Sequence, residues 1–157
     1  MKRVNALFFA VLIGMFFVLM SRIDYIVHST LYQYGLVFSY DWANMYWLTY
    51  NLVYLAFSLS LATCYYIGSE KNRQTKRIAL AIFISIAVLA VCGLQDMLFF
   101  VLWSDSLPPD TLVWWWSMWA HVFGTWNSKM QLALTTLGFM CVVATWILTI
   151  FKNKTIH

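Results

Sequence analysis

The stretch 68–77 reads GSEKNRQTKR and is the only strongly charged loop of the chain. It separates two apolar stretches, at about 42–67 and 78–103, and two more lie at about 5–30 and 129–151. A membrane-spanning helix takes about 20 predominantly apolar residues. The four stretches therefore predict an all-α, polytopic integral membrane protein, a four-helix bundle that forms one domain over residues 1–157.

Basic residues mark the side of the membrane on which the charged loop lies. Eight of the ten Lys and Arg residues occur in three clusters. These are Lys2 with Arg3, the 68–77 loop, and Lys152 with Lys154. An even number of spans places all three clusters on one side, and cytoplasmic loops are enriched in Lys and Arg. We therefore predict a multi-pass protein of the cell (cytoplasmic or inner) membrane with both termini cytoplasmic.

The composition excludes several classes of protein. The chain is 62% hydrophobic and only 10% charged, whereas about a quarter of the residues of a soluble domain are charged. The basic clusters lie at span ends, where membrane topology and anionic lipid headgroups account for them. We therefore predict membrane lipids as partners and no nucleic acid. No nucleotide-binding, haem or metallohydrolase motif occurs, so the sequence assigns no cofactor.

A Trp-rich segment precedes the last apolar stretch. Trp114, Trp115, Trp116 and Trp119 lie within 112–124, and Trp prefers the level of the lipid headgroups. We predict that 112–124 forms an interfacial or re-entrant helix before the last span. The alternative is one long, tilted helix that begins near Asp110.

Asp96 is the strongest candidate for a functional residue. In a continuous helix over 78–103, it would lie about 10 Å from the outer end. An unpaired charge at that depth is costly, so Asp96 is expected to be protonated or paired. Arg22 is the partner expected from its depth, and a structural Asp96–Arg22 bridge is one interpretation. In the other, Asp96 is an acid/base group or headgroup anchor at the base of a pocket.

Asp24 and His28 form a second candidate pair, four residues apart on one helix face. Such a pair can ligate a metal, or the carboxylate can orient the imidazole. A metal would need further ligands, and only His121 and Asp41 are obvious on the outer side. We predict no metal site and group Asp24 and His28 with Asp96 as candidate catalytic residues.

Polar side chains are concentrated in the outer half of the predicted bundle, whereas the inner half is nearly without them. Residues that serve only to join helices would be spread along the spans. The concentration predicts a pocket that opens toward the outer face. The candidate substrate-binding residues are Arg22, Asn44, Asn51, Gln95, Gln131, Trp119 and His121.

Three functions are compatible with this pattern. The first is binding of, or catalysis on, a lipophilic small molecule such as a lipid or an isoprenoid-like compound. The second is a non-catalytic accessory subunit that assembles with other membrane subunits. The third is a small transporter or channel. The predicted bundle is polar in its outer half but not in its inner half, which argues against a continuous path across the membrane.

Overall fold

The computed structural model describes residues 3–36, 40–104, 106–114 and 116–151, and omits the side chains of 3–7, 40–44 and 151. The described chain is helical, and its extended backbone is limited to one bridge between Val113 and Asn127. The helices are α1 (Arg3–Gln33), α2 (Tyr40–Ile67), α3 (Arg73–Val91), α4 (Leu94–Trp103), α5 (Met118–Phe123) and α6 (Ser128–Phe151).

Four of these helices are long and apolar enough to cross a membrane. The candidate spans are Phe8–Gln33, Met45–Ile67, Arg73–Val91 and Ser128–Ile150. Large apolar side chains are exposed on all four, for example Leu19, Leu48, Leu80 and Leu148. A soluble monomer rarely exposes so much contiguous apolar surface. The helices therefore indicate a multi-pass membrane protein.

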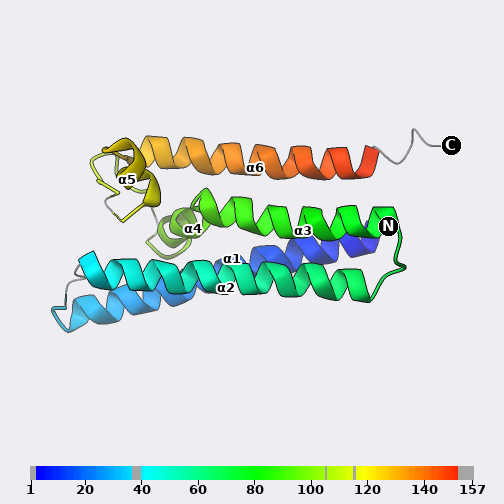
Figure 1. Cartoon of the computed structure of the whole chain (residues 1–157). Coiled ribbons are helices and arrows are strands. Elements are labelled where there is room, and N and C mark those ends of the chain that lie inside the picture. Colours follow the sequence, from blue (N-terminus) through cyan, green and yellow to red (C-terminus); the bar gives the residue numbers. More distant parts are fainter. Residues whose placement is uncertain (1–2, 37–39, 105, 115, 152–157) are drawn as a thin grey trace.

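The long helices lie side by side, so that the bundle has two ends. The start of α1, the loop between α2 and α3, and the end of α6 lie at one end (Figure 1). The end of α1, the start of α2, and the short helices α4 and α5 lie at the other, which we call the α4–α5 end. Helix α6 packs on α3 and α4, whereas α1 contacts α2 through side chains.

Aromatic rings fill the space between α1, α2 and α3. Phe17 on α1 and Ile82 and Ile86 on α3 have no exposed surface. Phe16 on α1 stacks on Phe57 of α2 with ring centroids 3.7 Å apart. These bulky side chains form the principal core, and they hold α1 in place against the α2–α3 pair.

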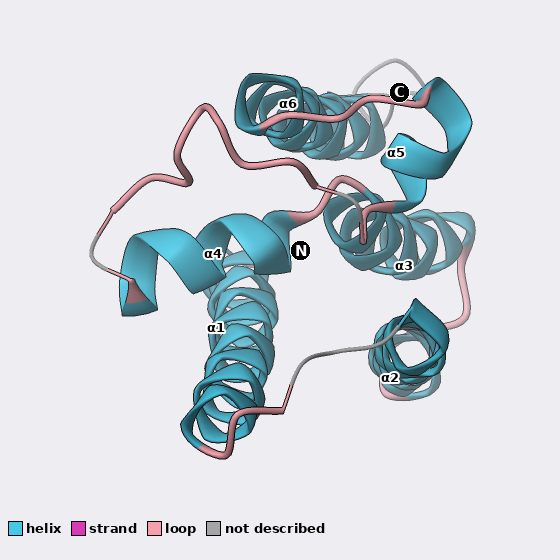
Figure 2. Ribbon diagram, turned by 90° about the vertical axis from the view of Figure 1, so that its left-hand side faces the viewer, coloured by secondary structure: helices cyan, strands magenta, loops and turns pink. Residues whose placement is uncertain are grey.

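The predicted continuous helix over 78–103 is wrong, because the helix breaks at Cys92 and Gly93. Helix α3 ends at Val91, and Gly93 precedes α4 with a φ of 70° in the left-handed region. Glycine adopts this conformation without the steric cost that a Cβ imposes. Helix α4 then runs across the bundle and lies against α1 (Figure 2).

The carbonyl groups freed by this break are bonded by side chains from α5 and α6. The Cys92 carbonyl accepts hydrogen bonds from Gln131 Nε2 (3.0 Å) and Thr135 Oγ1 (2.7 Å). The Val91 carbonyl accepts one from Trp119 Nε1 (3.1 Å). Within a bilayer no water is available to hydrogen-bond such carbonyl groups. A broken helix therefore persists only where other protein groups bond the freed carbonyls. The break is therefore stabilised by residues more than 25 positions away in the chain.

The Trp-rich segment is less helical than the sequence predicts. Of the described residues within 112–124, only Met118–Phe123 form a helix. The alternative of one long helix from Asp110 is wrong, because α6 begins at Ser128. Trp114 has no exposed surface and donates from Nε1 to Ser128 Oγ at 3.0 Å. Trp114 therefore serves as a small core for this segment, together with the buried Met97 and Trp126.

Candidate functional site

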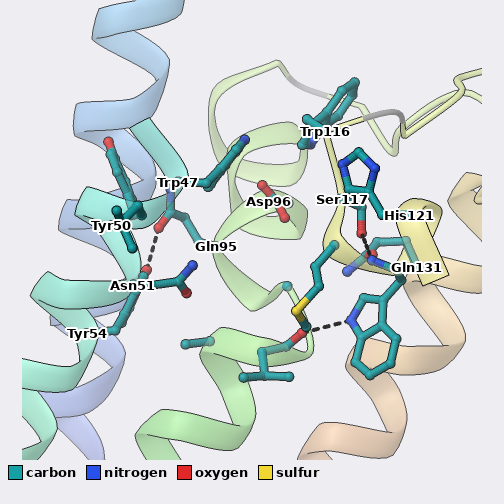
Figure 3. Close-up of a pocket in the computed structure, with 16 residues that line it drawn as sticks. Trp47, Tyr50, Asn51, Tyr54, Gln95, Asp96, Trp116, Ser117, His121 and Gln131 are labelled. Carbon is teal, nitrogen blue, oxygen red and sulfur yellow. Dashed lines mark hydrogen bonds between the residues drawn. The ribbon is translucent and has the colours of Figure 1, made fainter. Parts of the chain in front are cut away.

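A pocket of about 480 Å³ opens at the α4–α5 end, between α2, α4, α5 and α6 (Figure 3). Its wall combines aromatic rings with amide, hydroxyl and carboxylate groups. The lining residues used below are Trp47, Tyr50, Asn51, Tyr54, Gln95, Asp96, Trp116, Ser117, Trp119, His121 and Gln131.

The structure brings together six of the ten residues that the sequence singles out. Asn51, Gln95, Asp96, Trp119, His121 and Gln131 all line this one pocket. Three others, Arg22, Asp24 and His28, lie outside its lining. The side chain of Asn44 lies outside the described part of the chain.

Asp96 lies in the first turn of α4, three residues after the glycine that breaks the helix. Its carboxylate lies in the pocket, between Trp47 on one side and Trp116 and Ser117 on the other (Figure 3). Within the described residues, no hydrogen bond or ion pair reaches this carboxylate. Amide dipoles at a helix N-terminus favour a negative charge, so α4 offers Asp96 some stabilisation without a cation.

The expected bridge between Asp96 and Arg22 is wrong. The Arg22 guanidinium lies over the ring of Trp103, 4.6 Å from its centroid, and 5.3 Å from that of Tyr25. The helix break changes the direction in which Asp96 points, so a similar depth in the sequence pattern does not bring the two charges together. Arg22 is also exposed, as suits a cation that lies on aromatic faces near a membrane surface.

Asp24 is the opposite case, a buried carboxylate with partners from three helices. Its side chain accepts hydrogen bonds from Tyr46 Oη (2.5 Å) on α2 and Gln95 Nε2 (3.2 Å) on α4. His28 Nδ1 lies 3.0 Å from the same carboxylate. The hydroxyls of Tyr46 and Tyr50 are 2.8 Å apart. Because the Tyr46 proton bonds Asp24, the Tyr50 hydroxyl is the donor in that second contact.

Gln95 joins this network to the pocket wall. Its Oε1 accepts a hydrogen bond from the Tyr54 hydroxyl at 2.6 Å, while its Nε2 donates to Asp24. Gln131 is similarly engaged, since its Oε1 accepts from Trp126 Nε1 at 2.8 Å and its Nε2 donates to Cys92. Both amides are almost fully buried. Their bonds build the wall, whereas the described residues provide no hydrogen bond to the side chains of Asp96 and Asn51.

The tyrosines of α2 are not among the candidate site residues predicted from the sequence. Tyr46, Tyr50 and Tyr54 are spaced four residues apart, which places them on one helix face. Tyr50 and Tyr54 line the pocket, and Tyr46 reaches Asp24 behind it. This regular spacing is the signal that could have identified them.

The described residues hold no group of three or more His, Cys, Asp or Glu side chains close enough to share a metal ion. The described residues that line the pocket include one carboxylate and one imidazole, and none of them is a Lys or an Arg. Such an arrangement can hold a polar group beside Asp96 and surround it with aromatic surface, as ligand pockets commonly do.

Comparison with protein-family models, with curated proteins and with solved structures finds no match to this chain. The geometry of the pocket is therefore the basis for assigning a function.

Proposed function

We propose that this membrane protein binds a lipophilic molecule whose polar group enters the pocket and is anchored by Asp96. The observation that supports the proposal is a carboxylate inside an aromatic pocket with no described protein partner. A buried charge without a partner is unfavourable, whereas a bound polar group would compensate for it.

The rim of the pocket suits a ligand with an apolar tail. Leu48, Val91 and Met118 line the pocket and are exposed. Apolar side chains at that position provide a path from the pocket to lipid. An acyl or isoprenoid chain can therefore remain in the bilayer while its polar end lies beside Asp96.

Asp96 is also the candidate acid/base group if the protein transforms its ligand. Asp24 and His28 are the second choice for that role, because both are engaged in the buried network on the far side of Gln95. Incubating the reconstituted protein with its co-purified ligand and following the ligand's mass over time separates binding from catalysis.

The proposal is tested by extracting lipids from the purified full-length chain in neutral detergent. Wild-type protein is expected to retain a stoichiometric lipophilic molecule, and Asp96→Asn is expected to lose it while keeping the same helical content. Asp110→Asn is the matched control, since Asp110 is exposed, pairs with Lys129 and lies outside the pocket. Equal retention by all three proteins would contradict the proposed site.

A second candidate function is that of a subunit in a larger membrane complex. A groove of about 570 Å³ lies between α1, α3, α4 and α6 and is lined almost entirely by apolar side chains, among them Phe17, Leu98 and Phe139. A partner helix would fill it. A photo-crosslinker at Phe139 would then give a protein adduct of one defined mass, whereas lipid adducts alone would contradict the subunit function.

A further inference from the structure

We propose that the polar group bound beside Asp96 is a positively charged organic ammonium, as in a lipid with an amine or choline headgroup. This inference rests on the proposed function and specifies its ligand class. It follows from the charge of the pocket, the aromatic surface around it and the position of the nearby cations.

Among the described residues that line the pocket, Asp96 is the one carboxylate, and none is a Lys or an Arg. The two nearby cations are engaged elsewhere: Arg22 lies over Trp103, and Lys129 pairs with Asp110 at 2.8 Å. A second carboxylate, Asp24, lies behind Gln95. An anionic headgroup would meet like charges here, whereas a cation would meet opposite ones.

His121 is the one imidazole among the described residues that line the pocket. It is exposed, whereas Asp96 is half-buried. The imidazole at the exposed position can contact the remainder of a headgroup, such as a phosphate, while the ammonium occupies the interior.

Aromatic faces supply the second part of the recognition. Trp47, Tyr50, Tyr54, Trp116 and Trp119 all line the pocket. A cation near the face of a Trp or Tyr ring is attracted to its quadrupole, and aromatic cages are the usual means of binding quaternary ammonium groups. Several rings arranged around one carboxylate favour an ammonium group, either methylated or primary, over an uncharged polar group.

The remaining polar groups suit the rest of such a headgroup. Asn51 lines the pocket with its amide, and the described residues provide it no hydrogen bond. Ser117 contributes a hydroxyl, whose oxygen accepts from the Trp119 backbone N–H at 3.3 Å. An amide donor and a hydroxyl beside the ammonium position can bind the phosphate or ester oxygens of a lipid.

The test measures lipid binding by native mass spectrometry of the full chain in a neutral detergent. The probes are phosphatidylcholine, phosphatidylethanolamine and phosphatidylglycerol with identical acyl chains. We expect the two ammonium lipids to bind at least about tenfold more tightly than the anionic one. A tenfold difference in affinity corresponds to about 1.4 kcal/mol of binding free energy. Equal or tighter binding of phosphatidylglycerol, with the same dependence on Asp96, would overturn the ammonium inference and leave the proposed function intact.

Variants separate charge from shape. Asp96→Asn is expected to reduce phosphatidylcholine binding about tenfold or more, Asp96→Glu to retain most of it, and Trp47→Leu to weaken it severalfold. Asp110→Asn is expected to bind as wild type does. Binding by Asp96→Asn at wild-type strength would overturn the inference. A variant that still binds the lipid is folded, so this outcome needs no separate test of folding.

Free tetramethylammonium distinguishes the source of the ammonium and needs no variant. Displacement of phosphatidylcholine by this ion alone would support the ammonium site and indicate that a soluble amine can occupy it. Failure of tetramethylammonium together with displacement by dodecyltrimethylammonium would support a lipid ligand. If no probe binds specifically, the ammonium inference fails, and the lipid-extraction experiment alone decides the proposed function.

Discussion

Two carboxylates at the α4–α5 end have opposite surroundings, although Gln95 is adjacent in sequence to one and hydrogen-bonded to the other. Asp24 is 3% exposed and accepts hydrogen bonds from side chains of α2 and α4. Asp96 is half-buried, lines the pocket and has no described protein partner. A saturated buried carboxylate joins helices, whereas an unsaturated one in a cavity is available to a ligand. The same residue type thus has a structural position in one region and, in the other, the position that we propose for ligand binding.

Replacement of Gly93 by Ala should disturb both regions and have the largest effect. A left-handed non-glycine residue costs about 1–2 kcal/mol. A Cβ at this position would also lie 2.0 Å from Gln131 Nε2. Moving that amide would break its bond to Cys92, at a further cost of about 1–3 kcal/mol. Thermal unfolding in detergent, followed by Trp fluorescence, should show a loss of about 2–5 kcal/mol in the free energy of unfolding.

Gly14→Ala is the matched control for this variant. No heavy atom lies within 4 Å of a Cβ built on Gly14, and Ala is the better helix former in a helix interior. Its stability should equal or slightly exceed that of the wild type. Similar losses in the two glycine variants would contradict the role assigned to the break.

Asp24→Asn should produce the next largest effect. The side-chain NH₂ of the new Asn would face either the Tyr46 hydroxyl or the Gln95 amide, so that two hydrogen-bond donors would oppose each other. The charge-assisted hydrogen bonds to the carboxylate would also be lost. We expect a loss of about 2–3 kcal/mol in the free energy of unfolding, measured in the same way. A loss no larger than that of Asp96→Asn would remove the distinction between the two carboxylates.

Tyr54→Phe tests whether Gln95 must be held for the pocket to form. The variant removes the 2.6 Å hydrogen bond to Gln95 Oε1 and leaves a buried acceptor unsatisfied. The expected loss is about 1–2 kcal/mol, with a smaller loss of ligand binding than in Asp96→Asn. Tyr32→Phe, at an exposed position at the end of α1, is the control and should not change stability.

Asp96→Asn should have the smallest effect on stability and the largest on binding. Without ligand, removal of an unpartnered carboxylate relieves desolvation and loses a favourable helix-dipole interaction, so the net change should stay within about 0.5 kcal/mol. Unfolding of the delipidated protein measures this change, and lipid extraction measures binding. A loss of several kcal/mol would indicate a structural partner for Asp96 and contradict its role as a ligand anchor.

Much of the architecture could be predicted from local composition. Apolar runs separated by charged or turn residues predict four helices that can cross a membrane, and four such helices are present. Six of the ten candidate site residues line one pocket. The prediction of the four spans succeeds because hydropathy is summed over about 20 residues and does not depend on which way each side chain points.

The break at Gly93 could not be predicted in the same way. A glycine within a long apolar run also occurs where two helices pack closely, so the residue is ambiguous. Its left-handed conformation depends on Trp119, Gln131 and Thr135, which bond the freed carbonyls from distant parts of the chain. Arg22 and Asp96 were expected to pair because the sequence placed them at a similar depth in the membrane. That expectation assumed a continuous helix, so it did not predict that the two side chains lie apart.

The amino-acid sequence determined the helical class, the number of candidate spans and the end of the bundle at which polar side chains gather. The tertiary structure decided which carboxylate is saturated and which faces a cavity. The physical reason is the range of the interactions. Partition of a helix into lipid depends on its own residues, whereas the partners of a buried charge depend on helix direction, rotation about the helix axis and contacts that only the folded chain provides.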